Sequence, residues 1–136
     1  MNQDRARITV ADGAVAAILF AVAAAVGAYH GFDRPLHHEH DANITYLYQT
    51  LLINDGLKQT YMDHTGYLFL TLLSAWLKIV HLFGGVPAIG ISALEGSADM
   101  RAQFFDLLVA ARVLPVILTG AMGGVFYALL RVLDIR

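Results

Sequence analysis

The residues best suited to chemistry lie in one polar segment, residues 33–65, which separates two apolar runs. Five of the six histidines lie in this segment or next to it, and it carries five acidic residues against two basic ones. Its run His37-His38-Glu39-His40-Asp41 brings imidazole and carboxylate groups together. An ionised carboxylate can act as a general base, and imidazole with carboxylate can bind a divalent cation.

Metal binding is one interpretation of this run, with His40 as a candidate ligand. Imidazole favours zinc or copper, whereas carboxylates favour magnesium or manganese. Consecutive residues rarely point at one ion, and no histidine pair has the i, i+4 spacing of a helical metal site. The alternative is a hydrated loop in which Asp41 caps the following helix. Capping and catalysis by Asp41 are compatible, because both need an ionised, accessible carboxylate.

The composition places this segment in a membrane protein. Of the 136 residues, 57% are hydrophobic and 15% are charged, whereas soluble domains are about 45–50% apolar and roughly 25% charged. This composition excludes a soluble domain and a disordered tail, and the net charge of −2 gives no signal for a nucleic-acid partner. The absence of cysteine excludes disulfides, a thiolate metal site and a cysteine nucleophile.

Three apolar runs are long enough to predict transmembrane helices, at about 13–32, 66–83 and 113–130. The first is uncharged and would cover about 30 Å as a helix. A cleaved signal peptide is the alternative for it, although the run is longer than the usual apolar core of such peptides. Pro115 is expected in the first turns of the third span, where a missing amide hydrogen costs least.

Small residues suggest how these spans pack. In the first span they recur at four-residue spacing and predict a close-packing stripe: Gly13, Ala17, Ala21 and Ala25. In the third span Gly120 and Gly124 form a GxxxG pattern, which predicts a helix–helix contact.

An amphipathic helix is predicted within the polar segment, at about 42–55. Its apolar residues follow the i, i+3, i+4, i+7 spacing, and Asn54-Asp55-Gly56 supplies a stop. The helix is too short to span, so we expect it on the outer membrane surface. Asp63-His64 then precedes the second span, either as a substrate contact or as a helix cap with an interfacial histidine.

The predicted orientation has the N-terminus in the cytoplasm. The positive-inside rule favours it only narrowly. In this orientation the cytoplasmic side carries five basic residues, which are Arg5, Arg7, Lys78, Arg101 and Arg112. The outer side carries four, which are Arg34, Lys58, Arg131 and Arg136. The acidic balance of residues 33–65 favours the outer face for that loop.

The order of these features resembles the N-terminal part of the GT-C class of membrane glycosyltransferases, such as the protein O-mannosyltransferases and the aminoarabinose transferase of lipid A. An acidic residue follows the first span, then a surface helix, an Asp before the second span and an Arg, Arg112, before the third. The chain looks closer still to uncharacterised bacterial multi-pass proteins, over residues 14–133. Their motif is matched by Asn54, Gly56, Gln59, Tyr61, Asp63, His64 and Thr65.

The resemblance implies an enzyme of the bacterial inner membrane that transfers a sugar from a polyprenyl phosphate to a periplasmic acceptor. Asp41 occupies the position of the acidic residue of the GT-C active site, which acts as general base or as ligand of a divalent metal such as Mg²⁺ or Mn²⁺. Arg34 would offset the charge of the lipid phosphate. Glu39, Asp63 and His64 are the further candidates for substrate contact.

The expected architecture is therefore an all-α membrane domain of three transmembrane helices with a juxtamembrane helix in the first outer loop. GT-C enzymes have many more spans, so we expect this chain to be part of a longer multi-pass protein. Two alternatives remain. One is a non-enzymatic small membrane protein that associates through its small-residue faces. The other is a metal-binding accessory protein that uses His37, His38 and His40.

Overall fold

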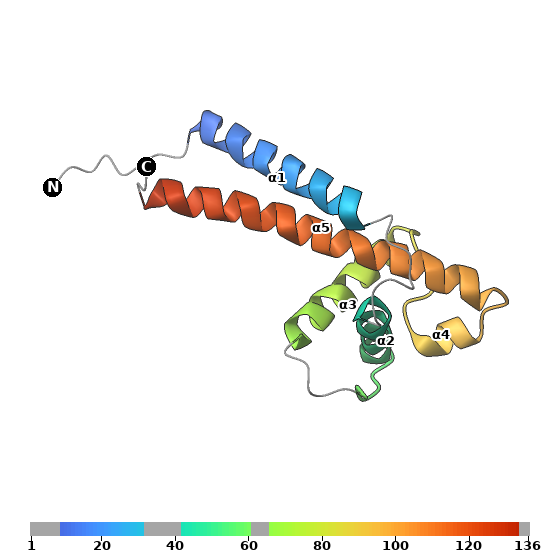
Figure 1. The fold of residues 1–136 in the computed structure, drawn as a ribbon. Coiled ribbons are helices and arrows are strands. Elements are labelled where there is room, and N and C mark those ends of the chain that lie inside the picture. Colours follow the sequence, from blue (N-terminus) through green and yellow to red (C-terminus); the bar gives the residue numbers. More distant parts are fainter. Residues whose placement is uncertain (1–8, 32–41, 61–65, 134–136) are drawn as a thin grey trace. The chain divides into compact units, whose positions relative to one another are not determined.

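The computed structural model of the chain describes residues 9–31, 42–60 and 66–133 (Figure 1). Within these ranges the chain is all-helical and has no strand. The helices are α1 (Val10–Gly31), α2 (Ala42–Asn54), α3 (Tyr67–Leu82), α4 (Ile91–Glu95) and α5 (Met100–Val132). The chain forms two compact units. The first unit comprises Met1–Asp33 and Pro115–Arg136, and the second comprises Arg34–Leu114, so α5 contributes to both. The all-α class predicted from the sequence is confirmed for the described residues.

Two of these helices are long and apolar enough to cross a membrane, α1 with 22 residues and α5 with 33. Few residues in either apolar stretch are buried, 6% in α1 and 11% in α5, unlike those of a core helix in a soluble domain. The predicted second span corresponds to α3, which is apolar but has only 16 residues. The count of three spans stays a prediction.

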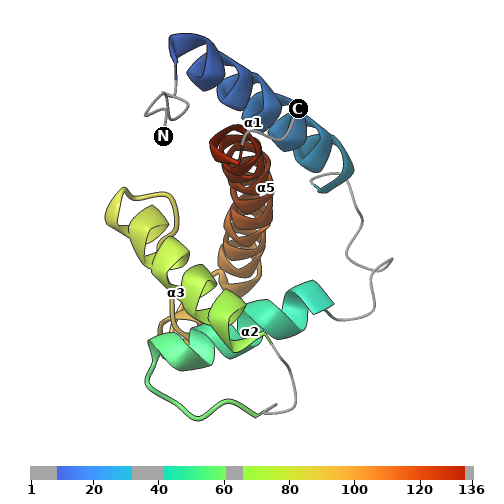
Figure 2. The same cartoon turned by 90° about the vertical axis from the view of Figure 1, so that its left-hand side faces the viewer.

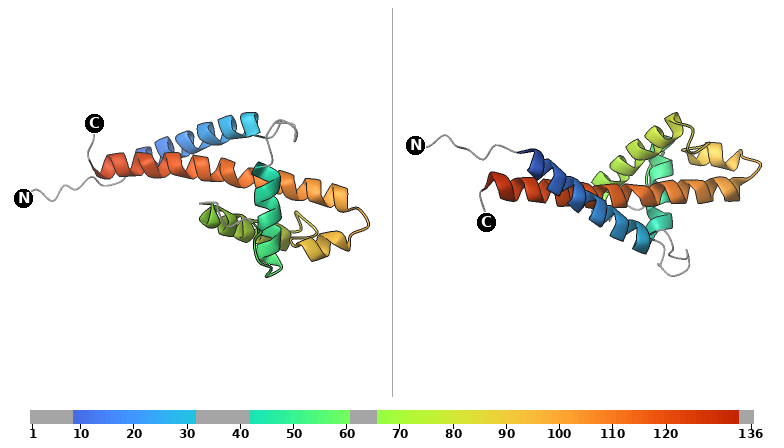
Figure 3. Two further views of the ribbon diagram at one scale, coloured as in Figure 1. Left: turned by 60° about the horizontal axis from the view of Figure 1, so that its bottom comes forward. Right: turned by 90° about the horizontal axis from the view of Figure 1, so that it is seen from above.

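In the first unit α1 lies alongside residues 115–132 of α5 (Figures 1 and 3). The two segments are antiparallel: Asp12 pairs with Arg131 near one end, and Gly27 lies against Val116 near the other. Between these ends, the Cβ of a residue at Gly120 would meet the ring of Phe20. The helix contact predicted at this glycine pattern is confirmed.

The small-residue stripe predicted on α1 does not face α5. Gly13 has no neighbour within 4 Å of where its Cβ would lie, and the other three residues of the stripe are exposed. Successive helical residues are about 100° apart, so the stripe that begins one residue after Asp12 points elsewhere. The pairing of Asp12 with Arg131 fixes which side of α1 faces its neighbour.

In the second unit α2 packs on α3 (Figure 2). The spacing that predicted an amphipathic helix at 42–55 is confirmed by α2, whose Leu47 and Leu51 are buried. The buried residues of α3 recur at helical spacing: Leu70, Leu73, Ser74 and Leu77. The apolar face of α2 is thus covered by protein, and burial of large side chains of this kind contributes about 1.5–3 kcal/mol each.

Both helices of this pair end at a glycine in the left-handed region. Gly56 after α2 has φ of 70° and Gly84 after α3 has φ of 76°. At the end of α2 the Gly56 N–H donates to the Ile53 carbonyl and the Leu57 N–H to the Leu52 carbonyl. These two hydrogen bonds satisfy carbonyls that a helix end would otherwise leave unpaired, in the Schellman arrangement. The stop predicted at Asn54-Asp55-Gly56 is confirmed.

Gly56→Ala is expected to destabilise the chain by about 1–2 kcal/mol, because an L side chain is strained at positive φ. Gly96→Ala is the matched control, since Gly96 ends α4 with φ of −78° and should change stability by less than about 0.5 kcal/mol. Urea unfolding in detergent micelles, followed by the fluorescence of Trp76, measures both. Equal losses in the two variants would contradict the conformational argument.

The third predicted span is only part of a longer helix. α5 begins at Met100 and not near residue 113, because Asp99 caps its start: the Ala102 N–H donates to Asp99 Oδ1 at 3.1 Å. The charges between residues 100 and 112 make that stretch unlike a membrane span, but they do not oppose a helix. Pro115 consequently lies inside the helix and not in its first turns, which corrects the prediction.

Candidate functional site

The residues predicted to carry the chemistry lie outside the described residues. They are Arg34, Glu39, His40, Asp41, Asp63 and His64. The structure describes the helices that follow them in the chain: α2 begins directly after Asp41, and α3 begins soon after His64.

The starts of α2 and α3 lie at the same end of the helix pair. Near the start, the rings of Tyr46 and Phe69 meet edge to face at 5.6 Å, and the Cβ position of Gly66 is 3.5 Å from Tyr46 Cε1. Further along both helices, Ser74 Oγ donates a hydrogen bond to Asn54 Oδ1 at 2.5 Å. The contacts advance in the same order along both helices, which cross each other at an angle (Figure 2).

Gln49 attaches the connection between these helices to α2. Its side chain is buried, its Nε2 donates to Thr60 Oγ1 at 2.7 Å, and its Oε1 accepts the Thr60 N–H at 3.1 Å. Both ends of the amide are therefore used by one residue of the returning chain. This pair of hydrogen bonds holds the described part of the connection beside the middle of α2.

Hydrogen bonds of Asn54 and Asp55 join the C-terminal end of α2 to the rest of the second unit. Asn54 Nδ2 donates to the Ile89 carbonyl at 2.7 Å, while its Oδ1 accepts the bond from Ser74. The neighbouring Asp55 accepts the Ser92 N–H at 2.8 Å. A Cβ at Gly90 would collide with the Asp55 carboxylate, so only glycine fits there without displacing it. Asn54 and Asp55 thus serve packing in this structure.

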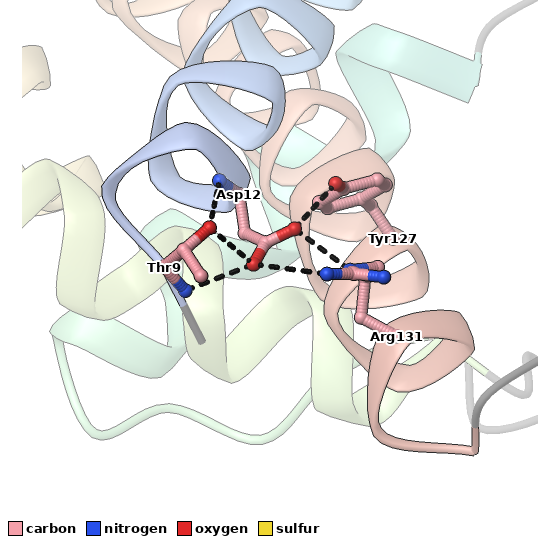
Figure 4. Close-up of polar contacts among 4 residues, drawn as sticks. All are labelled: Thr9, Asp12, Tyr127 and Arg131. Carbon is pink, nitrogen blue, oxygen red and sulfur yellow. Dashed lines mark hydrogen bonds and ion pairs between the residues drawn. The ribbon is translucent and has the colours of Figure 1, made fainter. Parts of the chain in front are cut away.

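A second polar cluster lies in the first unit, around Asp12 (Figure 4). The Asp12 side chain, from a residue only 7% exposed, accepts hydrogen bonds from Tyr127 Oη at 2.9 Å and Arg131 Nε at 2.7 Å through Oδ1. Its Oδ2 accepts from the Thr9 N–H at 2.8 Å and from Thr9 Oγ1 at 2.7 Å. Thr9, Tyr127 and Arg131 all donate hydrogen bonds to the Asp12 carboxylate, which thereby joins α1 to α5.

Thr9 and Asp12 form a capping box at the start of α1. The Asp12 N–H donates to Thr9 Oγ1 at 3.2 Å while the carboxylate accepts the Thr9 N–H, so two free backbone donors are satisfied reciprocally. The pattern Thr-x-x-Asp before an apolar run is the signal that could have identified this cluster in the sequence. Its partners Tyr127 and Arg131, by contrast, have no local signal.

The described residues contain no group of three or more His, Cys, Asp or Glu side chains arranged to hold a metal ion. The carboxylates of Asp12 and Asp55 each have hydrogen-bond partners within the protein. Comparison of the chain with protein-family models, with curated proteins and with solved structures found no match.

Proposed function

We propose that the chain is a membrane module of a GT-C-type glycosyltransferase and forms one wall of its active site. The observation that carries the proposal is the packing of α2 on α3, whose N-terminal ends lie at one end of the pair. Asp41 directly precedes one of these ends and Asp63-His64 closely precedes the other. Two acidic positions far apart in sequence are thereby tied to neighbouring helix ends.

The location proposed for this module is the inner membrane of a bacterium, with the N-terminus in the cytoplasm and the loop 33–65 in the periplasm. The lengths and exposed apolar surfaces of α1 and α5 support a membrane location. The partners in this proposal are membrane lipid and a polyprenyl-phosphate sugar, with further spans or subunits of the transferase. No nucleic acid is expected as a partner.

Asp41 is proposed as the general base of the transfer. It would take the proton of the acceptor hydroxyl while the hydroxyl oxygen bonds to the anomeric carbon and the bond from that carbon to the lipid phosphate breaks. Arg34 would offset the charge of the released phosphate. Glu39, Asp63 and His64 would contact the substrates. Asp41 and His40 are the proposed ligands if Mg²⁺ or Mn²⁺ takes part, since carboxylate oxygen suits both ions.

The experiment is sugar transfer by membranes that contain the full-length protein. Asp41→Asn is expected to reduce transfer of label from a polyprenyl-phosphate sugar by about 10²- to 10⁴-fold, the usual contribution of a general base. Asp106→Asn is the matched control, because it removes an exposed carboxylate of α5 and should leave transfer unchanged. Equal transfer by the wild type and Asp41→Asn would remove Asp41 from the mechanism.

The alternative proposal is a non-enzymatic membrane protein that associates through its small-residue helix faces. Gly120 lies against Phe20 of the same chain, so this face is used within the protein itself. Absence of any transfer by the full-length wild type would favour this alternative.

A further inference from the structure

We infer that the chain crosses the membrane twice, with α1 and residues 115–132 of α5 as a hairpin, and that residues 34–114 stay on its outer side. The first ground is the antiparallel register of the hairpin. Asp12 lies beside Arg131, Ala16 beside Gly124, Phe20 beside Gly120 and Gly27 beside Val116. Residue numbers rise on one helix as they fall on the other, along the whole length of the contact.

The direction of the two helices decides the number of crossings. If α1, α3 and α5 each crossed in turn, the first and third would run in the same direction through the bilayer. Antiparallel neighbours require an even number of crossings between them. Within the described residues between α1 and α5, α3 is the single apolar helix of ten or more residues, so that even number is zero. The 16 residues of α3 reach about 24 Å, less than the roughly 30 Å hydrocarbon core.

The surface of the hairpin fits the hydrocarbon core of a lipid bilayer. α1 has 22 residues and a length of about 33 Å, which is enough to span, and residues 115–132 are the end of a 33-residue helix that continues beyond them. Large apolar side chains on both helices are open to the outside, including Ile18 at 62% and Phe126 at 64% exposure. Lipid is the partner that covers such a surface without a matching protein shape.

The charges of the hairpin are confined to one end. Asp12 and Arg131 lie at the start of α1 and the end of α5, where they pair with each other. Pairing lowers the cost of charged groups at the edge of a membrane. The same end of the hairpin leads to Arg5, Arg7 and Arg136 in the sequence. With Arg131 they make four arginines at this end, against Arg34, Arg101 and Arg112 near the other, so the positive-inside rule favours the cytoplasmic side for it by a narrow margin.

This path places all of residues 34–114 on the periplasmic side. The polar loop 33–65 keeps the side that the sequence predicts for it, and α2, α3 and α4 join it there. Residues 34–114 contain five of the nine basic residues, but segments longer than about 60 residues are translocated largely regardless of their charge, so these residues do not oppose an outer location.

Single cysteines test the path directly, because the chain has no cysteine of its own. The four exposed positions are Val10, Lys58, Ala98 and Leu133. In intact cells whose outer membrane is permeable, a membrane-impermeant maleimide is expected to label Lys58→Cys and Ala98→Cys. Val10→Cys and Leu133→Cys should react only after the inner membrane is opened. Labelling of Lys58→Cys and Ala98→Cys from opposite sides overturns the inference, and so does labelling of all four from one side.

A cross-link provides a second measurement that does not depend on labelling. Gly27→Cys with Val116→Cys is expected to form a disulfide within one chain under mild oxidation, since a Cβ at Gly27 lies 3.4 Å from a methyl of Val116. Ala25→Cys with Val116→Cys is the control, because Ala25 is exposed. Equal yields from both pairs overturn the hairpin register. Neither measurement uses sugar transfer, so its outcome is separate from that of Asp41→Asn.

Discussion

Replacing Gly120 with leucine is expected to weaken the pairing of α1 with α5 by about 1–3 kcal/mol, the usual cost of overpacking a close contact. The Cβ position of Gly120 lies 2.7 Å from Cδ2 and 2.8 Å from Cε2 of Phe20, so any side chain there displaces the ring. The yield of the disulfide between cysteines at positions 27 and 116 measures the loss, about tenfold for each 1.4 kcal/mol.

Gly123→Leu provides the control for this prediction. Gly123 lies on the same helix but has no neighbour within 4 Å of its Cβ position, so the cross-link should persist. Phe20→Ala combined with Gly120→Ala is expected to restore pairing that Gly120→Ala alone weakens, because the smaller residue removes the collision. Equal effects of leucine at positions 120 and 123 would show that helix contact at Gly120 is unimportant.

Replacing Asn54 with alanine is expected to destabilise the second unit by about 2–4 kcal/mol. The change removes the donor to the Ile89 carbonyl and the acceptor of the Ser74 hydroxyl together. Ser74 is only 4% exposed, so its hydroxyl would lose its partner where water has little access. Buried polar groups left without partners cost about 1–3 kcal/mol each.

Two further variants separate the contributions to this effect. Asn54→Asp keeps an acceptor for Ser74 but replaces the donor to Ile89 with a carboxylate oxygen, so it should lose at least the Ile89 bond. Ser74→Ala removes one bond and should cost less than Asn54→Ala. Urea unfolding followed by Trp76 fluorescence is a suitable measurement, because the indole N–H donates to the Ala110 carbonyl within the same unit. An unchanged midpoint for Asn54→Ala would contradict the assignment.

Features of the fold that depend on neighbouring residues could be predicted from the sequence. The apolar spacing and the Asn54-Asp55-Gly56 stop located α2 closely, because amphipathic period and a left-handed glycine are local properties. The face of α1 that meets α5 could not be predicted in the same way. Asp12 selects it through Arg131, which is 119 residues away.

The same distinction between local features and long-range contacts applies to the candidate site. The sequence could locate the helices that follow Asp41 and His64. It could not predict how these two helices pack on each other, which depends on contacts such as that of Tyr46 with Phe69. Part of the motif that suggested a transferase also has a structural explanation. Asn54 bridges α3 and the segment before α4, and Gly56 supplies a positive φ. Asp41, Asp63 and His64, which lie outside the described residues, carry the chemical part of the resemblance.

The long sequence separation within the Asp12 cluster sets an order for assembly during synthesis. The bonds between Thr9 and Asp12 span three residues and can form as soon as the first helix leaves the ribosome. The bonds to Tyr127 and Arg131 span 115 and 119 residues and must wait until almost all of α5 has been made. While the nascent chain grows, the capping box therefore supplies hydrogen bonds to one oxygen of the Asp12 carboxylate, before the partners of the other oxygen have been made. Closure of the hairpin by Arg131 therefore follows the synthesis of α2, α3 and α4.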